Sequence, residues 1–406
     1  MLFSTVIGFV GYFKTRDQGK AYIDDLPFRL HYTFTTAFLF LGSVVVGLQD
    51  LVGKNIDCVN AEDAINYYCW VTGTQILVNS NPKDSIYPGI GTGVHHGTRS
   101  CIQTYDAYGR KTWETSRGEP CFRTIDYYIW IPYALFLKGC LFYIPRLLWL
   151  SWEEGVMNTF SEGVRYGTKV EVEKVNDVAD IVTRYLKNDE YMGHILYGWG
   201  YVFAQTLNFL NVIGAFLFTD YFFHGQFKNL GRAWLMNSNK SNDVLLALFP
   251  RMTTCIFEQY GSGGVVRRKD YLCVLAPNVI SEKIYLFLWF WLILLGIISG
   301  INLLLVLFMS LKSMRVRNLY MMRAVLNSRK VTKWGNANAE KELNQSIRKM
   351  SLGQFLFLYL LGRNVDRPTY ESIIIFYSKS LKREDHYVSL ETLEQNSRLS
   401  STVVQG

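Results

Sequence analysis

The sequence is poor in charged residues, and three of its stretches contain none. Asp, Glu, Lys and Arg make up 19% of the 406 residues, against roughly 25% in an average globular domain. They are absent from residues 30–49, 195–219 and 284–311. Each stretch reaches the length of about 20 residues with which a helix crosses the apolar core of a bilayer. The sequence therefore predicts a membrane protein.

Side chains that serve catalysis are also scarce. No acid–histidine cluster and no metal-ligand cluster falls within the apolar stretches, and the six histidines lack the spacing of a membrane metal centre. The glycine-rich run 89–93, followed by His95 and His96, has no predicted strand before it and no predicted helix after it, so it does not indicate a phosphate loop. We therefore expect no enzymatic activity, no cofactor and no metal.

A fourth apolar stretch, residues 127–152, is interrupted by two basic residues. Arg146 lies near one end, where its side chain can reach the lipid headgroups, and Lys138 lies near the middle. The cysteines favour counting this stretch as a span, because only then do six of the seven lie in two loops on one side of the membrane. These six are Cys58, Cys69, Cys101, Cys121, Cys255 and Cys273. An even set of cysteines in an oxidising compartment indicates disulfides. We therefore predict an all-α membrane protein with four transmembrane helices, disulfide-linked extracellular loops and a helical cytoplasmic domain.

Basic residues orient the chain. Residues 312–331, directly after the last span, contain six Lys and Arg and no acid, and loops rich in Lys and Arg stay in the cytoplasm. Both ends are then cytoplasmic. The net charge of +8 follows from this topology and from attraction to anionic lipid, and we expect no nucleic-acid partner. The predicted segments are a cytoplasmic N-terminal segment (1–28), spans at 29–49, 127–152, 194–219 and 283–311, outer loops at 50–126 and 220–282, a cytoplasmic loop (153–193), and a cytoplasmic C-terminal domain ending in a disordered tail (312–406).

Polar side chains within the predicted spans need partners. An ionisable group at the middle of the membrane costs at least about 2.5 kcal/mol, so we predict that Lys138 faces a pore or an aqueous pocket between helices. The alternative is a helix register in which it reaches the headgroups. Gln205, Asn208 and Asn211 recur every three residues on one helical face, and lipid cannot satisfy their amides. These groups are expected to face other helices or water.

The start of the second span carries the most specific motif. Residues 127–132 read Tyr-Tyr-Ile-Trp-Ile-Pro, with Tyr127, Tyr128, Trp130 and Pro132 as its distinctive members, and residues 141–146 read Leu-Phe-Tyr-Ile-Pro-Arg. This pair resembles the innexin signature, Tyr-Tyr-Gln-Trp-Val followed by Phe-Tyr-x-Pro-Arg, except that Ile129 replaces Gln. Further segments that resemble the family are residues 25–32, 68–71, 207–214, 249–253, 278–285 and 359–364. In order, they cover roughly residues 22–376 and look most like arthropod innexins.

The resemblance implies a gap-junction channel subunit in the plasma membrane at cell–cell junctions. It implies a homo- or hetero-oligomer with other innexins, a ring of eight, that docks to the apposed hemichannel of a neighbouring cell and passes ions and small metabolites. It also implies that Cys58 pairs with Cys273 and Cys69 with Cys255. The first loop is longer than is usual in the family, and Cys101 and Cys121 would close this insertion (about 79–121), unless they are free or pair between molecules. Met1, Leu2 and Phe3 are the candidates for a pore constriction.

Other interpretations remain open at this stage. A non-docking hemichannel of the same fold differs only in its outer loops, and the irregular, long first loop favours it. A four-span adhesion or scaffold protein without a pore explains the disulfides but not Lys138 or the amide face. Asn239 begins a glycosylation sequon in the second outer loop, and a glycan there could obstruct docking.

Overall fold

The computed structural model describes residues 21–78, 85–87, 90–91, 102–105, 111–114, 121–162, 172–187, 191–236, 245, 248–310, 350–365 and several positions between 370 and 380. Met1, Leu2, Phe3, Cys101 and Asn239 lie outside these residues, and of Cys121 only the backbone is described. The chain divides into two compact units. The first comprises Met1–Arg29, Ile144–Asn208 and Ser299–Gly406, and the second comprises Leu30–Tyr143 and Phe209–Ile298.

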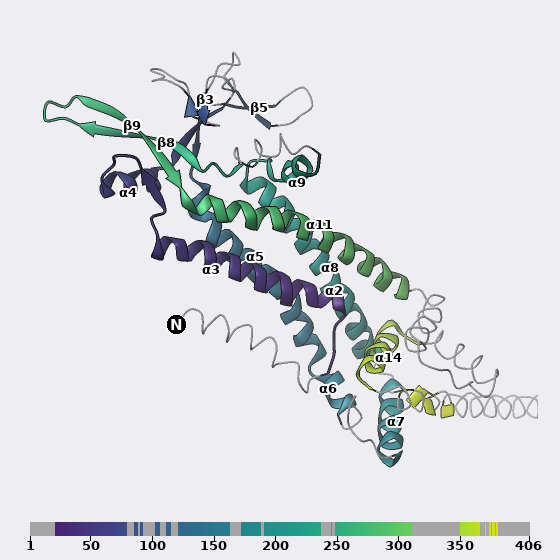
Figure 1. Cartoon of the computed structure of the whole chain (residues 1–406). Coiled ribbons are helices and arrows are strands. Elements are labelled where there is room, and N and C mark those ends of the chain that lie inside the picture. Colours follow the sequence, from purple (N-terminus) through teal and green to yellow (C-terminus); the bar gives the residue numbers. More distant parts are fainter. Residues whose placement is uncertain are drawn as a thin grey trace, which may run out of the picture. The chain divides into compact units, whose positions relative to one another are not determined.

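Four helices in the described part of the chain are long and apolar enough to cross a membrane (Figure 1). The first consists of α2 (Leu26–Arg29), the π-helical turn η1 (Leu30–Thr35) and α3 (Thr36–Val52). The second joins the 3₁₀ turn η2 (Tyr127–Trp130) to α5 (Ile131–Glu153). The third and fourth are α8 (Tyr191–Phe222) and α11 (Ala276–Ser310). In each of the four helices, no more than 39% of the apolar 18-residue stretch is buried inside the protein. This suits helices whose remaining surface faces lipid. The prediction of four transmembrane helices is confirmed.

Within the second unit, three of these helices make specific contacts. Ser43 of α3 donates a hydrogen bond to the carbonyl of Pro132 at 2.8 Å. The indole of Trp291 in α11 donates to the Thr35 hydroxyl at 2.9 Å, and its ring packs on Phe34 with centroids 4.4 Å apart. The first span therefore packs against both the second and the fourth.

The loops between the spans form a sheet, which the sequence analysis did not predict. Its five strands are β1 (Ile56–Cys58), β2 (Thr74–Val78), β7 (Cys121–Ile125), β8 (Met252–Tyr260) and β9 (Val266–Leu275), in the order β1-β9-β8-β2-β7 and antiparallel. Helix α4 (Asp63–Thr72) connects β1 to β2. Three strands come from the first loop and two from the second, so both loops build one domain.

Two short hairpins lie between β2 and β7, in the stretch that was predicted to be irregular. They pair β3 (Ser85–Tyr87) with β4 (Ile90–Gly91), and β5 (Ile102–Tyr105) with β6 (Lys111–Glu114). The second loop also contains α9 (Phe227–Met236), which follows the third span. The insertion residues that the structure describes therefore lie in strands.

The first unit adds short helices to the ends of the spans. These are α6 (Val156–Ser161), α7 (Val172–Lys187) and α14 (Leu352–Asn364). A capping box starts α14: the Ser351 hydroxyl accepts from the Gln354 amide, and the Gln354 side chain accepts from the Ser351 amide. Most of its side chains are buried.

Candidate functional site

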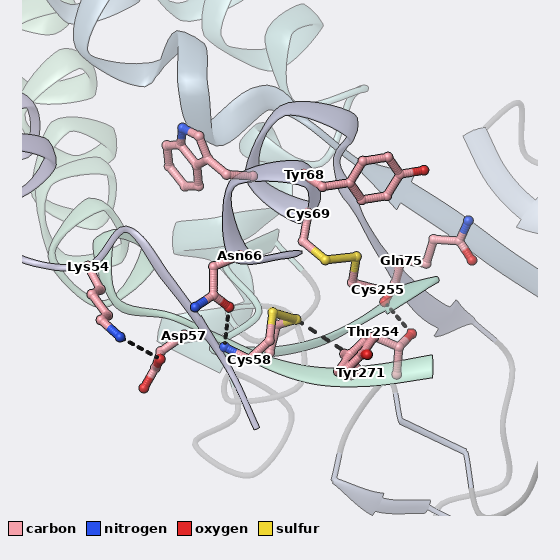
Figure 2. The surroundings of a disulfide bond; sticks show 12 residues. Lys54, Asp57, Cys58, Asn66, Tyr68, Cys69, Gln75, Thr254, Cys255 and Tyr271 are labelled. Atoms are coloured by element: carbon pink, nitrogen blue, oxygen red, sulfur yellow. Dashed lines mark hydrogen bonds and ion pairs between the residues drawn. A yellow bond between two sulfur atoms is a disulfide. The ribbon is translucent and has the colours of Figure 1, made fainter. Parts of the chain in front are cut away.

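Two disulfides join the two loops (Figure 2). Cys58 of β1 bonds to Cys273 of β9, and the two residues are direct partners in the register of these strands. Cys69 of α4 bonds to Cys255 of β8. All four cysteines are buried. These are the two pairs that the family resemblance implied. Each bridge connects the first loop to the second, so the spans on either side are tied together outside the helices.

Hydrogen bonds support the bridged region on both sides. The amide of Cys58 donates to the Asn66 side chain of α4 at 3.0 Å, and the Thr254 hydroxyl of β8 donates to the Gln75 carbonyl of β2 at 3.0 Å (Figure 2). Asn66 was not singled out in the sequence, because nothing there distinguishes it from other surface amides. Its burial is set by the fold of α4 over β1.

The signature tyrosines hold this domain to the second span. The Tyr128 hydroxyl lies 3.4 Å from the Cys69 carbonyl, and its ring packs on Trp70 with centroids 4.6 Å apart. The Tyr127 hydroxyl donates to the Leu248 carbonyl. Both tyrosines are buried, whereas Trp130 is exposed, as an aromatic side chain at a membrane interface can be. The motif therefore anchors both loops at the point where the second span begins.

Lys138 lies inside the second unit and not on an exposed face. Its side chain is only 2% exposed, and its ammonium sits 5.2 Å from the ring centroid of Tyr285 and 5.5 Å from that of Phe218. Within the described part of the chain the ammonium has no hydrogen-bond partner. Cation–π attraction to two rings offsets part of the desolvation of the charge. Between α5, α8 and α11 the ammonium therefore faces aromatic rings, and the prediction that Lys138 faces a pore or an aqueous pocket between helices stays a prediction.

Two side chains of the amide face on the third span donate hydrogen bonds within the protein. Pro145 lies within α5 and has no N–H, so it cannot bond the carbonyl of Leu141 one turn earlier. The Asn211 side chain of α8 donates to that carbonyl at 2.8 Å. Gln205, on the same helix, donates to the Tyr201 hydroxyl at 2.9 Å. Asn211 and Gln205 thus satisfy polar groups that lipid would leave unpaired, whereas the buried Asn208 amide has no hydrogen-bond partner among the described residues.

In the first unit, a buried carboxylate clamps the chain just before the first span. Asp24 is 1% exposed and accepts from Arg29 at 2.8 Å and from Arg146 of α5 at 3.0 Å. The indole of Trp149, also in α5, donates to the Ile23 carbonyl at 2.8 Å. Arg146, which the sequence placed near the headgroups, therefore has a carboxylate partner.

A second carboxylate, Asp25, joins the same segment to two further helices. It accepts from the Tyr201 hydroxyl of α8 at 2.5 Å and from the Arg363 guanidinium of α14. The Tyr359 hydroxyl of α14 lies 3.5 Å from it. Burial, and to a lesser degree the charge of Asp25, raises the pKa of Tyr359 to about 12, so this phenol keeps its proton at physiological pH.

Helix α14 is fixed by two further contacts. The Asn364 side chain accepts from the Tyr22 amide at 2.5 Å and donates to the Tyr22 carbonyl at 2.8 Å. At the other end of α14, Gly353 crosses Gly198 of α8 so closely that a Cβ on Gly353 would lie 1.6 Å from the His194 carbonyl oxygen. The tail helix therefore holds the segment that precedes the first span.

Four apolar spans and a disulfide-linked domain built from two loops define a multi-pass membrane protein with a stiffened surface outside the bilayer. The Innexin family model matches residues 24–380. Innexin inx3 of Drosophila melanogaster is 31% identical over 92% of this chain and 89% of its own length. Innexin inx2 of the same species is 31% identical over 90% and 93%, and innexin inx2 of Schistocerca americana 30% over 89% and 94%. The chain belongs to the innexin family, whose members are channel proteins that form gap junctions.

Proposed function

We propose that the chain is a subunit of an intercellular channel, in which rings in two apposed plasma membranes enclose an aqueous pore for ions and small metabolites. The observation that carries this proposal is the joint domain of the two loops. Two buried disulfides and a five-stranded sheet hold it together, and such a rigid surface lowers the entropic cost of binding another protein. Family membership supports the same role.

The proposed assembly is a ring of eight subunits, homomeric or mixed with other innexins, that docks to a second ring. Both chain termini are cytoplasmic in this arrangement, and the basic residues of 312–331 support that orientation. The apolar residues Met1, Leu2 and Phe3 are proposed to line the narrowest part of the pore, which would then select by size more than by charge. Replacing Leu2 and Phe3 with Ala should admit larger dyes, and an unchanged size limit would refute their assignment.

Cys101 and Cys121 are proposed to close the first-loop insertion by a third disulfide. Cys121 starts β7 at one end of the insertion, and β5 begins directly after Cys101. Non-reducing peptide mapping tests this pairing, and a link from Cys101 to Cys58 would contradict it. The same mapping reports whether Asn239 carries a glycan.

A non-docking hemichannel is the second candidate. The hairpins β3–β4 and β5–β6 add structure to the first loop between β2 and β7, and added structure there could hold two rings apart. A scaffold or adhesion role without a pore is the third, since it too would use a rigid surface.

Current and dye passage in single expressing cells and in cell pairs separate the three candidates. An intercellular channel passes current and dye between paired cells. A hemichannel gives current in single cells and no coupling in pairs. An adhesion protein gives contact between cells without either. The proposal is contradicted by the second and third results.

A further inference from the structure

One face of the β8–β9 hairpin is basic. Phe257 pairs with Lys269 and Gln259 with Arg267, and directly paired residues share one side of a hairpin. Gln259, Arg267 and Lys269 are exposed. The opposite face has mixed charge, since Arg268 there pairs with Glu258 at 2.9 Å.

Two cations on the first face therefore have no matching acid. Within the described residues, neither Arg267 nor Lys269 takes part in an ion pair. The hairpin projects from the five-stranded sheet (Figure 1). We call Arg267, Lys269 and Gln259 the basic face.

An acidic patch lies on the first-loop part of the same domain. Asp57 of β1 and Asp63 at the start of α4 both lie near Lys54, at 3.7 and 3.5 Å, and are 66% and 92% exposed. Glu62 precedes Asp63 and is also exposed. Three acids and one lysine leave this surface with a net charge of −2. We call Asp57, Glu62 and Asp63 the acidic patch.

A hollow opens beside the acidic patch. Its volume is about 170 Å³, and it is lined by Lys54, Asn55, Ile56, Asp63, Asn66, Tyr67 and Trp70. Aromatic walls and a carboxylate rim suit a guanidinium, which stacks on rings and bonds carboxylates. Tyr67 is 72% exposed, so its ring is accessible to a partner.

We propose that the basic face of one copy docks on the acidic patch of a second copy in the apposed membrane. This inference rests on the proposed function and names the residues of its docking contact. The two surfaces carry opposite charge on one chain. In a two-fold contact, each copy presents its basic face to the acidic patch of the other, so both surfaces are matched at once. Arg267 is the side chain that enters the hollow.

A charge exchange between two cells tests the contact. The hairpin variant is Arg267→Glu with Lys269→Glu, and the patch variant is Asp57→Lys, Glu62→Lys and Asp63→Lys. Arg268→Gln is the matched control, because it lies on the same strand and faces the other side. Surface biotinylation shows that each variant folds and reaches the membrane. Junctional conductance and fluorescent plaques at cell contacts are recorded for each pairing, and plaques report docking without current.

Pairs in which both cells carry the same variant should lose roughly tenfold or more of both signals, because like charges across an interface strongly oppose association. A hairpin-variant cell facing a patch-variant cell should regain them, since each contact again joins opposite charges. The Arg268→Gln control should match the unmodified chain.

Three results would overturn the contact. One is normal coupling and plaques in pairs that share a variant. Another is failure of the mixed pair to recover while both variants reach the surface, which would point to another acidic partner, such as a lipid or glycan. The last is recovery only when both sets of substitutions sit in one chain, which would place the contact between neighbours in one ring. If the unmodified chain forms plaques without conductance, the proposed pore is wrong and the docking contact is still read from the plaques.

Discussion

Removing the Cys69–Cys255 bridge while Cys58–Cys273 remains should loosen the loop domain by a predictable amount. While Cys58–Cys273 is intact, the Cys69–Cys255 bridge closes a ring of chain. This ring runs 11 residues from Cys58 to Cys69 and 18 residues from Cys255 to Cys273. A closed loop of about 29 residues is worth about 3.6 kcal/mol in the chain-entropy account. That is about a 400-fold change in the ratio of opened to closed domain, since each 1.4 kcal/mol is tenfold. Both cysteines are changed to Ser, so that no unpaired partner thiol is left.

Hydrogen exchange of the β8 and β9 amides measures this opening directly. In the double variant, exchange at 252–260 and 266–275 should quicken by about the same 400-fold, while the amides of α11 keep their protection. Cys140→Ser is the control, because Cys140 is in no disulfide, and it should leave exchange unaltered. Unchanged protection of β8 and β9 in the double variant would show that the sheet alone holds the loops together.

Three further predictions concern the helices, and thermal unfolding of the purified protein measures each of them. Gly353→Ala should lower the melting temperature, because the new Cβ would lie 1.6 Å from a backbone carbonyl oxygen of α8. Gly193→Ala is the control and should leave it unchanged, since a Cβ there meets no atom within 4 Å. Equal melting temperatures of the two variants would refute the close crossing. Lys138→Met should leave stability unchanged or raise it by about 1–4 kcal/mol, because replacing a buried charge with an apolar side chain is often stabilising. A clear loss of stability would show that the ammonium has a partner. Arg363→Met should cost about 1.5–3 kcal/mol, the usual worth of a hydrogen bond to a charged group. Most of that cost should vanish when Asp25→Asn is also present, and additive effects would mean that the pair does not interact.

The apolar spans could be predicted from the sequence because their signal is local. A run of 20 or more uncharged residues needs no knowledge of the rest of the chain. The disulfide pairs followed from the family resemblance, since spacing alone leaves several connectivities open. The sheet was missed because β1 and β2 are only three and five residues long, and because β1 pairs with a strand more than 200 residues away and β2 with one about 180 residues away.

For the polar contacts too, local features could be predicted from the sequence, whereas contacts between distant residues could not. The sequence indicated that Lys138 and Arg146 were out of place among apolar residues, but not where each would point. Arg146 meets Asp24, 122 residues earlier, and Lys138 is enclosed by rings from two other helices. Pro145 leaves the Leu141 carbonyl without its helical hydrogen bond. That the Asn211 amide bonds this carbonyl could be predicted only once the packing of α8 against α5 was known.

Dual whole-cell recording from cell pairs tests the central claim most directly. One set of pairs expresses the chain in both cells, and the other in a single cell of each pair. The proposed intercellular channel predicts junctional conductance and dye transfer when both cells express it. A contradictory result is current across the membrane of single expressing cells with no conductance between paired ones.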